Sequence, residues 1–522
     1  MLWVALHLPS LSLESFAATL VAADTHAASA GQAIALVDEH CISAANAAAL
    51  AQGVKPGLKR ATALALAPRI VLGQADAARD AEALLPVAHA ALAFTPNVSL
   101  QPALEPGRAA DTVLLEVQAS LRYFGGIDRL LQRLRATIEP LGHALRVATA
   151  ATAQGAAVLA RVEAPPLCAT IEATRQALAK APVWLLGPGR AHWEALQGMG
   201  LRQIGDLLGL PRAGLARRFG EALLADLDAA LGHRADPREP IVPARMFDSR
   251  LELFARADSS EQVLHGAQVL LARLVAWLAA QHAFVRRFRL LMHHETRWQQ
   301  GDRTPQATAL EIALAEPARD SAHLLVLLRE RLAQVQLPAP TLELALQAED
   351  IVKRAAPNNE LFPTRQSEDE GLTRLIERLQ ARLGAGQVQR LVAVEDHRPE
   401  RASRLQGDAI VRPAGAEQRG TRRAHAPATA AQTRAPSARP VWLQAPEPLA
   451  ERNARPLLDG RPLGLLSGPE RIEGGWWDEA LAERDYFIAE AADGALVWIY
   501  RARLPLSASG GESGWFLHGR FG

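Results

Sequence analysis

The sequence is poor in cysteine and nearly neutral, and both features exclude classes of protein. Its 522 residues include two cysteines, Cys41 and Cys168, which lie far apart in the chain. Two such cysteines suggest neither a disulfide framework nor a metal cluster, and they suit a reducing cytoplasm. The formal net charge is +1. A nucleic-acid-binding function would therefore depend on local basic patches rather than on bulk charge.

Targeting signals and membrane-length apolar runs are also missing from the sequence. The first 16 residues are apolar but lack the basic stretch and the small-residue cleavage site of a secretory signal peptide. No apolar run reaches the roughly eighteen residues that a membrane-spanning helix needs. We therefore expect a soluble cytoplasmic protein that has no membrane partner.

The first third of the chain reads as a mixed α/β domain. Alanine and leucine dominate the composition, which favours helices. Short runs rich in β-branched residues are interspersed among the helices, as in an α/β fold. We expect strands at residues 2–8, 32–38, 112–118 and 143–150, and helices at 12–23, 42–66 (with a break at 53–57), 75–93, 127–138 and 153–162.

The rest of the chain changes character several times. Residues 181–231 are helical with two glycine-bearing hairpins, and residues 241–348 mix strands with long amphipathic helices at 260–282 and 318–334. Residues 401–440 hold eight arginines against two acidic residues. Such a composition cannot bury a core and predicts a flexible basic linker. The aromatic, turn-rich tail after it predicts a small β-containing domain.

Four stretches, taken together, resemble the DinB/UmuC type of Y-family DNA polymerase and occur in that family's order. They are residues 44–68, 111–126, 148–161 and 185–220, which match patterns of the fingers, a palm strand, the next strand and helix, and the thumb. The four matches follow one another in the family's order between residues 44 and 220, which chance does not readily explain. The chain is therefore identified as a member of the Y family.

This resemblance implies a multidomain α/β fold, with a right hand of palm, fingers, helical thumb and α/β little finger, followed by a linker and a small β-containing domain. The expected parts are palm and fingers at 1–170, a helix-hairpin-helix thumb at 171–238, a little-finger-like domain at 239–352, a clamp-binding motif with a helical segment at 353–400, the flexible basic linker at 401–440, and a partner-binding domain at 441–522.

The carboxylates that the family uses for catalysis are mostly replaced. Nucleotidyl transfer uses two Mg²⁺ ions, which need hard oxygen ligands. In the family these come from an Asp-x-Asp-like site on the first strand and an Asp-Glu pair at the palm hairpin. Here His7 and Pro9 occupy the first site, and Asp111 and Thr112 the second. Imidazole is a poor Mg²⁺ ligand, and one carboxylate cannot hold two ions.

Other parts of the family's active site are missing as well. The tyrosine and arginine that grip the triphosphate correspond to Ala47 and Leu50, and the aromatic pair that checks the sugar corresponds to Leu11 and Ser12. We therefore expect a vestigial site with no catalytic residue, no bound metal and no cofactor. The alternative is an active translesion polymerase whose carboxylates lie in a different register.

Residues 358–362 resemble the peptide by which proteins dock on the sliding clamp. Leu361 and Phe362 would fill an apolar pocket, and the amide of Asn358 would bind its rim. Asn359 and Glu360 complete the pentapeptide. Asn358 stands where the family motif has glutamine, which shortens the reach by one methylene. The alternative interpretation of a Leu-Phe pair is a local core contact.

Two groups of residues are candidate DNA contacts. Gly187, Gly189 and Gly200 lie in thumb hairpins whose turns can present backbone N–H groups to a phosphate, although glycines at helix ends are often simple caps. The second group is basic: Arg286, Arg287 and Arg289 on a predicted strand, with Arg161 at a position where the family usually has lysine. Its alternative is a solvated protein face.

The C-terminal part narrows the resemblance within the Y family. Residues 372–384, 395–402, 468–487 and 514–522 are similar to segments of a catalytically defective branch found in a bacterial mutagenesis cassette. That branch implies two protein partners, a RecA-like accessory protein and an error-prone C-family DNA polymerase. Trp476 and Trp477 are the candidate partner-binding residues, with a place in the domain's own core as the alternative.

We therefore expect an inactive adaptor for DNA damage tolerance and induced mutagenesis. It would hold primer-template DNA, bind the sliding clamp and raise the local concentration of an error-prone polymerase for translesion synthesis. A third interpretation, a structural or RNA-binding protein that resembles the Y family by accident, predicts neither clamp binding nor a preference for primer-template.

Overall fold

The computed structural model describes residues 1–20, 31–105, 107–295, 306–353, 365–406, 439–440, 442–478, 480–503 and 514–521. The chain divides into two compact units, Met1–Arg382 and Leu383–Gly522. The pentapeptide expected to bind the clamp, 358–362, lies outside the described residues.

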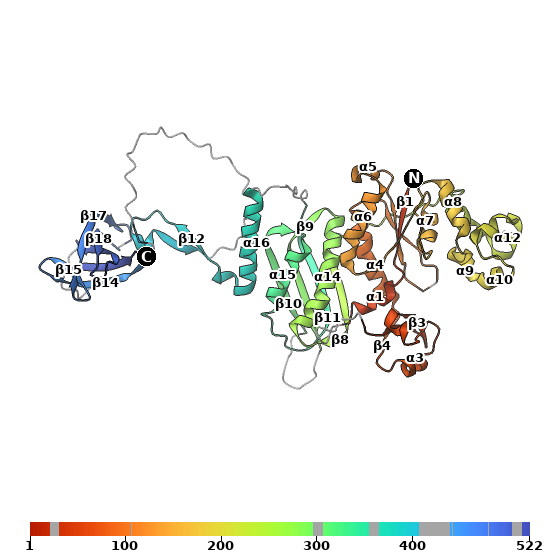
Figure 1. The fold of residues 1–522 in the computed structure, drawn as a ribbon, viewed down its shortest axis with the longest axis horizontal. Helices are drawn as coiled ribbons and strands as arrows, with labels where there is room; N and C mark the ends of the chain where they lie inside the picture. Colours follow the sequence, from red (N-terminus) through yellow and green to blue (C-terminus); the bar gives the residue numbers. More distant parts are fainter. Residues whose placement is uncertain are drawn as a thin grey trace. The chain divides into compact units, whose positions relative to one another are not determined.

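An antiparallel sheet with helices on both faces forms the first part of unit 1 (Figure 1). Its strand order is β5-β6-β1-β7, and its elements are β1 (Trp3–His7), β5 (Val98–Gln101), β6 (Thr112–Glu116), β7 (Arg146–Ala150), α4 (Ala77–Leu92), α6 (Ile127–Ile138) and α7 (Ala153–Ala160). Alternate residues of the central strand face opposite sides. Val4 and Leu6 pack with α4 and α6, whereas Ala5 packs with α7.

A small sheet of order β3-β2-β4 lies between α1 and α4 in the chain, and part of it corrects our prediction. We expected a helix from residue 42, but Cys41–Ala45 is strand β3, which pairs with β2. Alanine favours helices only weakly, and tertiary context overrides that preference. Here Ile42 is buried and its backbone bonds to Leu58 and Gly57. The other elements are α1 (Leu11–Ala17), β2 (Ile34–Asp38), α2 (Ala47–Ala51), α3 (Arg60–Leu66) and β4 (Val71–Gln74).

Short helices follow, as the glycine-bearing pattern predicted. They pack through their leucines onto α7, so that this helical region shares one core with the first sheet. The elements are α8 (Ile171–Lys180), η2 (Val183–Leu185), α9 (Gly187–Ala191), α10 (Trp193–Gly198), α11 (Ile204–Leu208), α12 (Arg212–Phe219) and α13 (Glu221–Leu231).

A four-stranded antiparallel sheet of order β10-β9-β11-β8 forms the next part of unit 1. Helices α14 and α15 cover one face and bury Trp277 and Phe288 in a common core. Helix α16 follows β11 in the chain and adds Ala381 to that core. The elements are β8 (Phe247–Ala257), α14 (Ser260–Ala280), β9 (Ala283–His294), β10 (Ala307–Ala318), α15 (Ser321–Leu332), β11 (Thr341–Lys353) and α16 (Arg365–Leu383).

Helix α14 corrects our expectation about membrane-length segments. By length and composition it could cross a membrane, but 61% of its apolar window is buried inside the protein. Its burial instead matches the core helix of a sheet-and-helix domain, because its leucines pack on the sheet.

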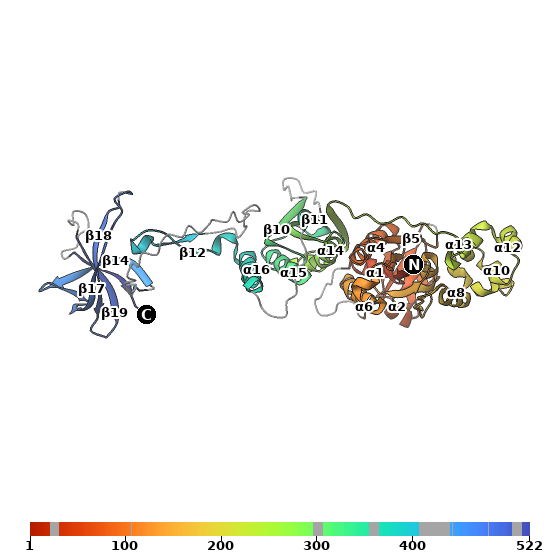
Figure 2. The ribbon, with the colours of Figure 1, turned by 90° about the horizontal axis from the view of Figure 1, so that it is seen from above.

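Unit 2 contains a hairpin and a seven-stranded sheet of order β16-β15-β14-β20-β19-β18-β17 (Figure 2). The hairpin pairs β12 with β13, so the range expected as a linker from residue 401 includes a strand near its start. Tyr486, Trp498 and Tyr500 form part of the core. The elements are β12 (Arg390–Ala393), η4 (Pro399–Arg401), β13 (Ser403–Gln406), β14 (Trp442–Arg452), β15 (Arg455–Leu458), β16 (Arg461–Pro462), β17 (Gly464–Gly474), β18 (Ala482–Glu490), β19 (Leu496–Ala502) and β20 (Trp515–Arg520).

Candidate functional site

The positions expected to be vestigial metal ligands meet at the end of β1 and the start of β6. His7 pairs directly with Thr112 in the antiparallel register, and the Leu8 N–H donates to the Asp111 carbonyl over 2.9 Å. The His7 Nδ1 atom lies 3.1 Å from Thr112 Oγ1 and 3.6 Å from Asp111 Oδ1. The structure therefore brings His7, Asp111 and Thr112 into one polar group.

Asp111 is engaged by an arginine from the end of helix α7. The Arg161 Nη2 atom donates to Asp111 Oδ1 over 2.6 Å, and the Arg161 side chain is only 5% exposed. The Thr112 hydroxyl donates to the same oxygen over 2.8 Å. Burial by itself raises the pKa of Asp111, but the hydrogen bond from His7 and the charge of Arg161 outweigh it and lower that pKa to about 2. Asp111 is thus held as an ionised carboxylate.

A cavity of about 290 Å³ opens beside this group. Pro9, Ser12, Asp80 and Asp111 are among its lining residues. Asp80 is buried and accepts hydrogen bonds from Ser12 and from the Ser15 hydroxyl, the latter over 2.6 Å. Ser12, at the expected sugar-checking position, is therefore bonded within the protein.

Metal-binding geometry can be assessed for the described part of the chain. There, no group of three or more His, Cys, Asp or Glu side chains is arranged to hold a metal ion. His294, which lies between His293 and Glu295 in the sequence, bonds to Thr308 over 2.7 Å and to Thr341 over 3.2 Å.

The candidate thumb glycines have identifiable roles inside the fold. The Gly187 N–H donates to Asp226 over 3.2 Å. A Cβ at Gly189 would lie 2.3 Å from the Val183 carbonyl oxygen, so only glycine fits there. Gly200 has a φ of 79°, a left-handed conformation, just after α10. Phosphate binding by these three residues stays a prediction.

A buried polar network that the sequence did not predict surrounds Gly187. Arg238 donates to Gln101 over 2.7 Å, to Gln154 over 3.0 Å and to Asp236 over 2.5 Å. Gln154 in turn donates to Asp226 over 3.1 Å. This network joins β5, α7 and α13, and thus fixes the helical region against the first sheet. Nothing in the sequence around Arg238, which follows α13, indicated that this residue would join the two regions.

The arginines of β9 divide between two environments. Arg287 and Arg289 are exposed on the face of the sheet opposite α14 and α15, while Arg286 is half-buried. Glu311 on β10 lies 3.5 Å from Arg287 and 3.4 Å from Arg289. A shared carboxylate thus partly neutralises the two arginines that a DNA backbone could reach.

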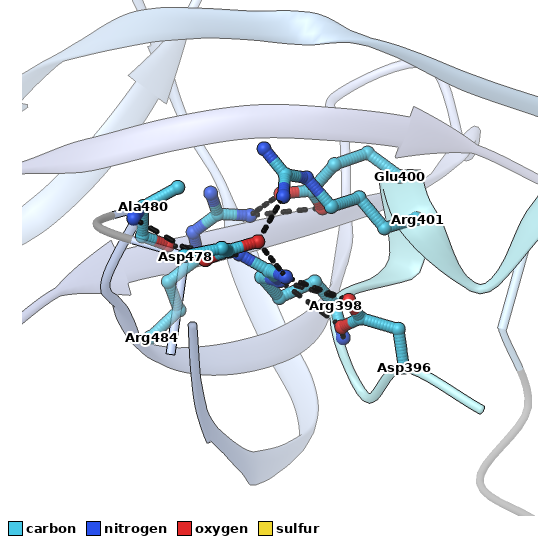
Figure 3. Close-up of polar contacts among 7 residues, drawn as sticks. All are labelled: Asp396, Arg398, Glu400, Arg401, Asp478, Ala480 and Arg484. Atoms are coloured by element: carbon cyan, nitrogen blue, oxygen red, sulfur yellow. Dashed lines mark hydrogen bonds and ion pairs between the residues drawn. The ribbon is translucent and has the colours of Figure 1, made fainter. Parts of the chain in front are cut away.

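The two candidate partner-binding tryptophans lie on the surface of unit 2. Trp476 is 75% exposed and Trp477 is 54% exposed, and their ring centroids are 4.5 Å apart. Trp476 is not among the buried residues of the aromatic core cluster, which includes Trp498, and its role in partner binding stays a prediction. The Trp477 ring centroid lies 5.3 Å from the Cζ atom of the buried Arg398, which is the centre of an ion cluster (Figure 3).

Comparison with curated proteins decides the family. The chain is 30% identical over 494 residues to Protein ImuB from Caulobacter vibrioides, in the strains NA1000 / CB15N and ATCC 19089 / CIP 103742 / CB 15. The match covers 90% of this chain and 100% of each relative. The chain belongs to the ImuB family. No protein-family model matches it.

Solved structures similar to this ImuB-family chain include those of Y-family DNA polymerases. A Dbh ternary complex with partially disordered substrates is 14% identical, with a TM-score of 0.37, over 67% of this chain and 99% of that one. An insertion ternary complex of Dbh DNA polymerase is 12% identical, with a TM-score of 0.38, over 68% and 100%. DinB from Sulfolobus solfataricus is 14% identical, with a TM-score of 0.35, over 68% and 100%.

Proposed function

We propose that this ImuB-family chain is a polymerase-like adaptor in DNA damage tolerance that has no nucleotidyl-transferase activity of its own. The observation that carries the proposal is the pairing of Asp111 with Arg161. A carboxylate that accepts from a guanidinium and a hydroxyl, with the His7 imidazole 3.6 Å away, is already satisfied, so that a cation would have to displace these partners.

The residues present therefore do not fit the pair of Mg²⁺ ions that the Y-family reaction uses. Magnesium requires near-octahedral oxygen ligands, and His7, Pro9 and Thr112 supply no carboxylate. The guanidinium of Arg161 also occupies Asp111 Oδ1, an oxygen that an ion would need as a ligand.

DNA binding would use surfaces away from this degenerate site. Arg287 and Arg289 could follow a phosphate backbone across the exposed face of the β9 sheet, and each phosphate contact would release counterions. The turns at Gly187, Gly189 and Gly200 would add backbone contacts. Arg161 is a weaker candidate than these residues, because its guanidinium is buried against Asp111.

Recruitment would use the peptide at 358–362 and the tryptophan surface of unit 2. The peptide would bind the sliding clamp, and Trp476 with Trp477 would bind the RecA-like accessory protein or the error-prone C-family polymerase. Tethering several partners on one chain raises their effective concentration at a stalled primer end without any chemistry by the adaptor. A cytoplasmic location follows from these partners.

The competing function is an active translesion DNA polymerase of the Y family. It is favoured by one observation, the cavity of about 290 Å³ that both Asp80 and Asp111 line. Those carboxylates would have to exchange their present partners for metal ions when a nucleotide binds.

Primer extension separates the two functions. Purified protein and its Asp111→Ala variant are supplied with Mg²⁺, then Mn²⁺, on undamaged and lesion-bearing templates, while anisotropy of a labelled primer-template reports binding. The adaptor predicts binding by both proteins and extension by neither. Extension by the wild type that Asp111→Ala abolishes would overturn the proposal.

A further inference from the structure

Residues Asp396–Arg401, which include the 3-10 turn η4, are docked on the β-domain of unit 2. Arg398 is the centre of the contact and is only 2% exposed. Its Nη2 atom lies 2.7 Å from Asp478 Oδ2 and 2.7 Å from Asp396 Oδ2, and its Nη1 atom donates to the Ala480 carbonyl over 3.0 Å (Figure 3). Arginine is rarely buried this fully unless it is paired.

The β-domain is shaped to receive this guanidinium. Gly475 has a φ of 88°, and a Cβ there would lie 2.6 Å from Arg398 Nη1. The Trp477 ring centroid lies 5.3 Å from the Arg398 Cζ atom, within cation–π range. Asp478, the Ala480 carbonyl and the Trp477 ring therefore form an arginine pocket whose floor requires glycine.

A second contact fixes the register of the docked segment. Glu400 lies 3.0 Å from Arg484 on β18, and Arg401 forms an ion pair with Asp478. The segment thus presents a cation at 398, an anion at 400 and a cation at 401, and the β-domain meets each with the opposite charge (Figure 3).

We propose that residues 439–521 form a peptide-binding module that recognises an Arg-Pro-Glu-Arg sequence, and that its resident ligand is the chain's own Arg398–Arg401. Bidentate arginine–carboxylate pairs combine strength with geometric specificity, and a buried arginine that loses its partner is strongly disfavoured. The ion cluster therefore holds the module onto the hairpin β12–β13 without help from the chain that connects them.

This arrangement changes the role of residues 407–438. They leave from Gln406, on the hairpin, and return at Arg439, at the module, so that both their ends belong to unit 2. The basic stretch expected as a linker therefore connects two parts of unit 2. In the chain, residues 384–389 follow α16 and lead into β12.

Cutting the chain tests the proposal directly. A protease site is placed within 407–438 of the full-length protein, and the cut protein is passed over a size-exclusion column. We expect the fragment carrying 439–522 to elute with the rest of the chain. Separation of the two wild-type fragments would overturn the proposal.

Variants of the cut protein test the pocket itself. Arg398→Ala is expected to abolish co-elution, whereas Arg404→Ala, which removes an exposed arginine from β13 of the same hairpin, is expected to preserve it. Near-UV circular dichroism of the released fragment shows whether its aromatic core stays folded. If the fragments of the cut Arg398→Ala variant still co-elute, Arg398 does not hold the module onto the hairpin.

Charge reversal and competition complete the test. Glu400→Arg is expected to weaken co-elution, and Arg484→Glu added to it is expected to restore co-elution, which a general loss of folding would not allow. A synthetic peptide of residues 394–403 in excess is expected to displace the C-terminal fragment, and the same peptide with Arg398→Ala is not. Failure of the wild-type peptide to displace the fragment would refute recognition by sequence.

Discussion

The guanidinium of Arg161 lies 2.6 Å from the carboxylate of Asp111, which lines the cavity beside the end of β1. The two residues are fifty positions apart in sequence, at the end of α7 and at the start of β6. Their ion pair gives Asp111 a structural partner where the family resemblance implies metal ions. The protein thus pairs the carboxylate of Asp111 with a cation of its own.

The ion pair predicts a pH dependence of stability. The pKa of Asp111 is lowered from 3.8 to about 2 in the folded protein, so the unfolded state takes up the proton first. The stabilisation is therefore fully present above about pH 4 to 5 and is lost as the pH falls toward about 2. Thermal melts should show the Tm advantage of wild type over Asp111→Asn constant from about pH 7 to 5 and shrinking below that.

Arg161→Ala provides the control for this experiment. Removing the cation takes away one cause of the lowered Asp111 pKa. In the Arg161→Ala background, the Tm difference between the proteins with Asp111 and with Asn at this position should therefore change less with pH. An unchanged dependence would show that Arg161 does not stabilise the ionised carboxylate.

Arg287 and Arg289 are expected to contribute to DNA affinity through the exposed face of the β9 sheet. The double alanine variant should bind primer-template more weakly, and the slope of log K against log salt should fall by about 0.9 for each phosphate that the variant no longer neutralises. Arg329→Ala, an exposed change on α15, should leave the slope unchanged. A double variant with the wild-type slope would favour a merely solvated strand face.

Glu311→Gln is expected to act in the opposite direction. Its carboxylate lies within 3.5 Å of both Arg287 and Arg289, so that removing its charge frees both arginines for phosphate. The variant should bind primer-template more tightly than wild type at low salt, with a steeper salt dependence measured by anisotropy. Weaker binding would place Glu311 among the residues that DNA binding needs.

Clamp binding is expected to depend on Leu361 and Phe362. Replacing both with alanine should weaken binding at least about 30-fold, since anchor residues contribute roughly 2 kcal/mol or more. Asn358→Gln should tighten binding by restoring the longer amide, and Asn359→Ala should change little. Surface plasmon resonance on immobilised clamp gives all three values, and wild-type affinity for the double variant would exclude this peptide.

Trp476→Ala is expected to weaken recruitment of the C-family polymerase or the RecA-like protein without destabilising unit 2. Trp476 is exposed, whereas Trp498 is buried, and truncating a buried tryptophan costs about 3–5 kcal/mol. Pull-down of each partner measures recruitment, and the melting of unit 2 measures stability. A large loss of stability in Trp476→Ala would assign it a core role. Substitution of Trp477 would not separate recruitment from stability, because Trp477 also contacts Arg398.

Local patterns along the chain determined much of the fold. The helix at Ile127–Ile138 and the start of the strand at Thr112 were predicted at the residues where they occur. Hydrophobic periodicity and residue propensity act over a few neighbouring residues, so they predict a helix or a strand without knowledge of the rest of the molecule. The family resemblance, and the expectation that His7, Pro9 and Thr112 stand in place of carboxylates, also needed only the order of residues.

Tertiary structure decided the partners. Cys41–Ala45 is a strand because β2 lies beside it, against the helical preference of its alanines. Asp111 pairs with Arg161, and Arg398 pairs with Asp478 eighty residues away, because folding brings the two members of each pair into contact. An ion pair between distant residues leaves no periodic trace in a single sequence, since its energy arises only when both groups lose water together. The sequence therefore determined which groups this chain carries, and the packing of its sheets and helices decided which of them meet.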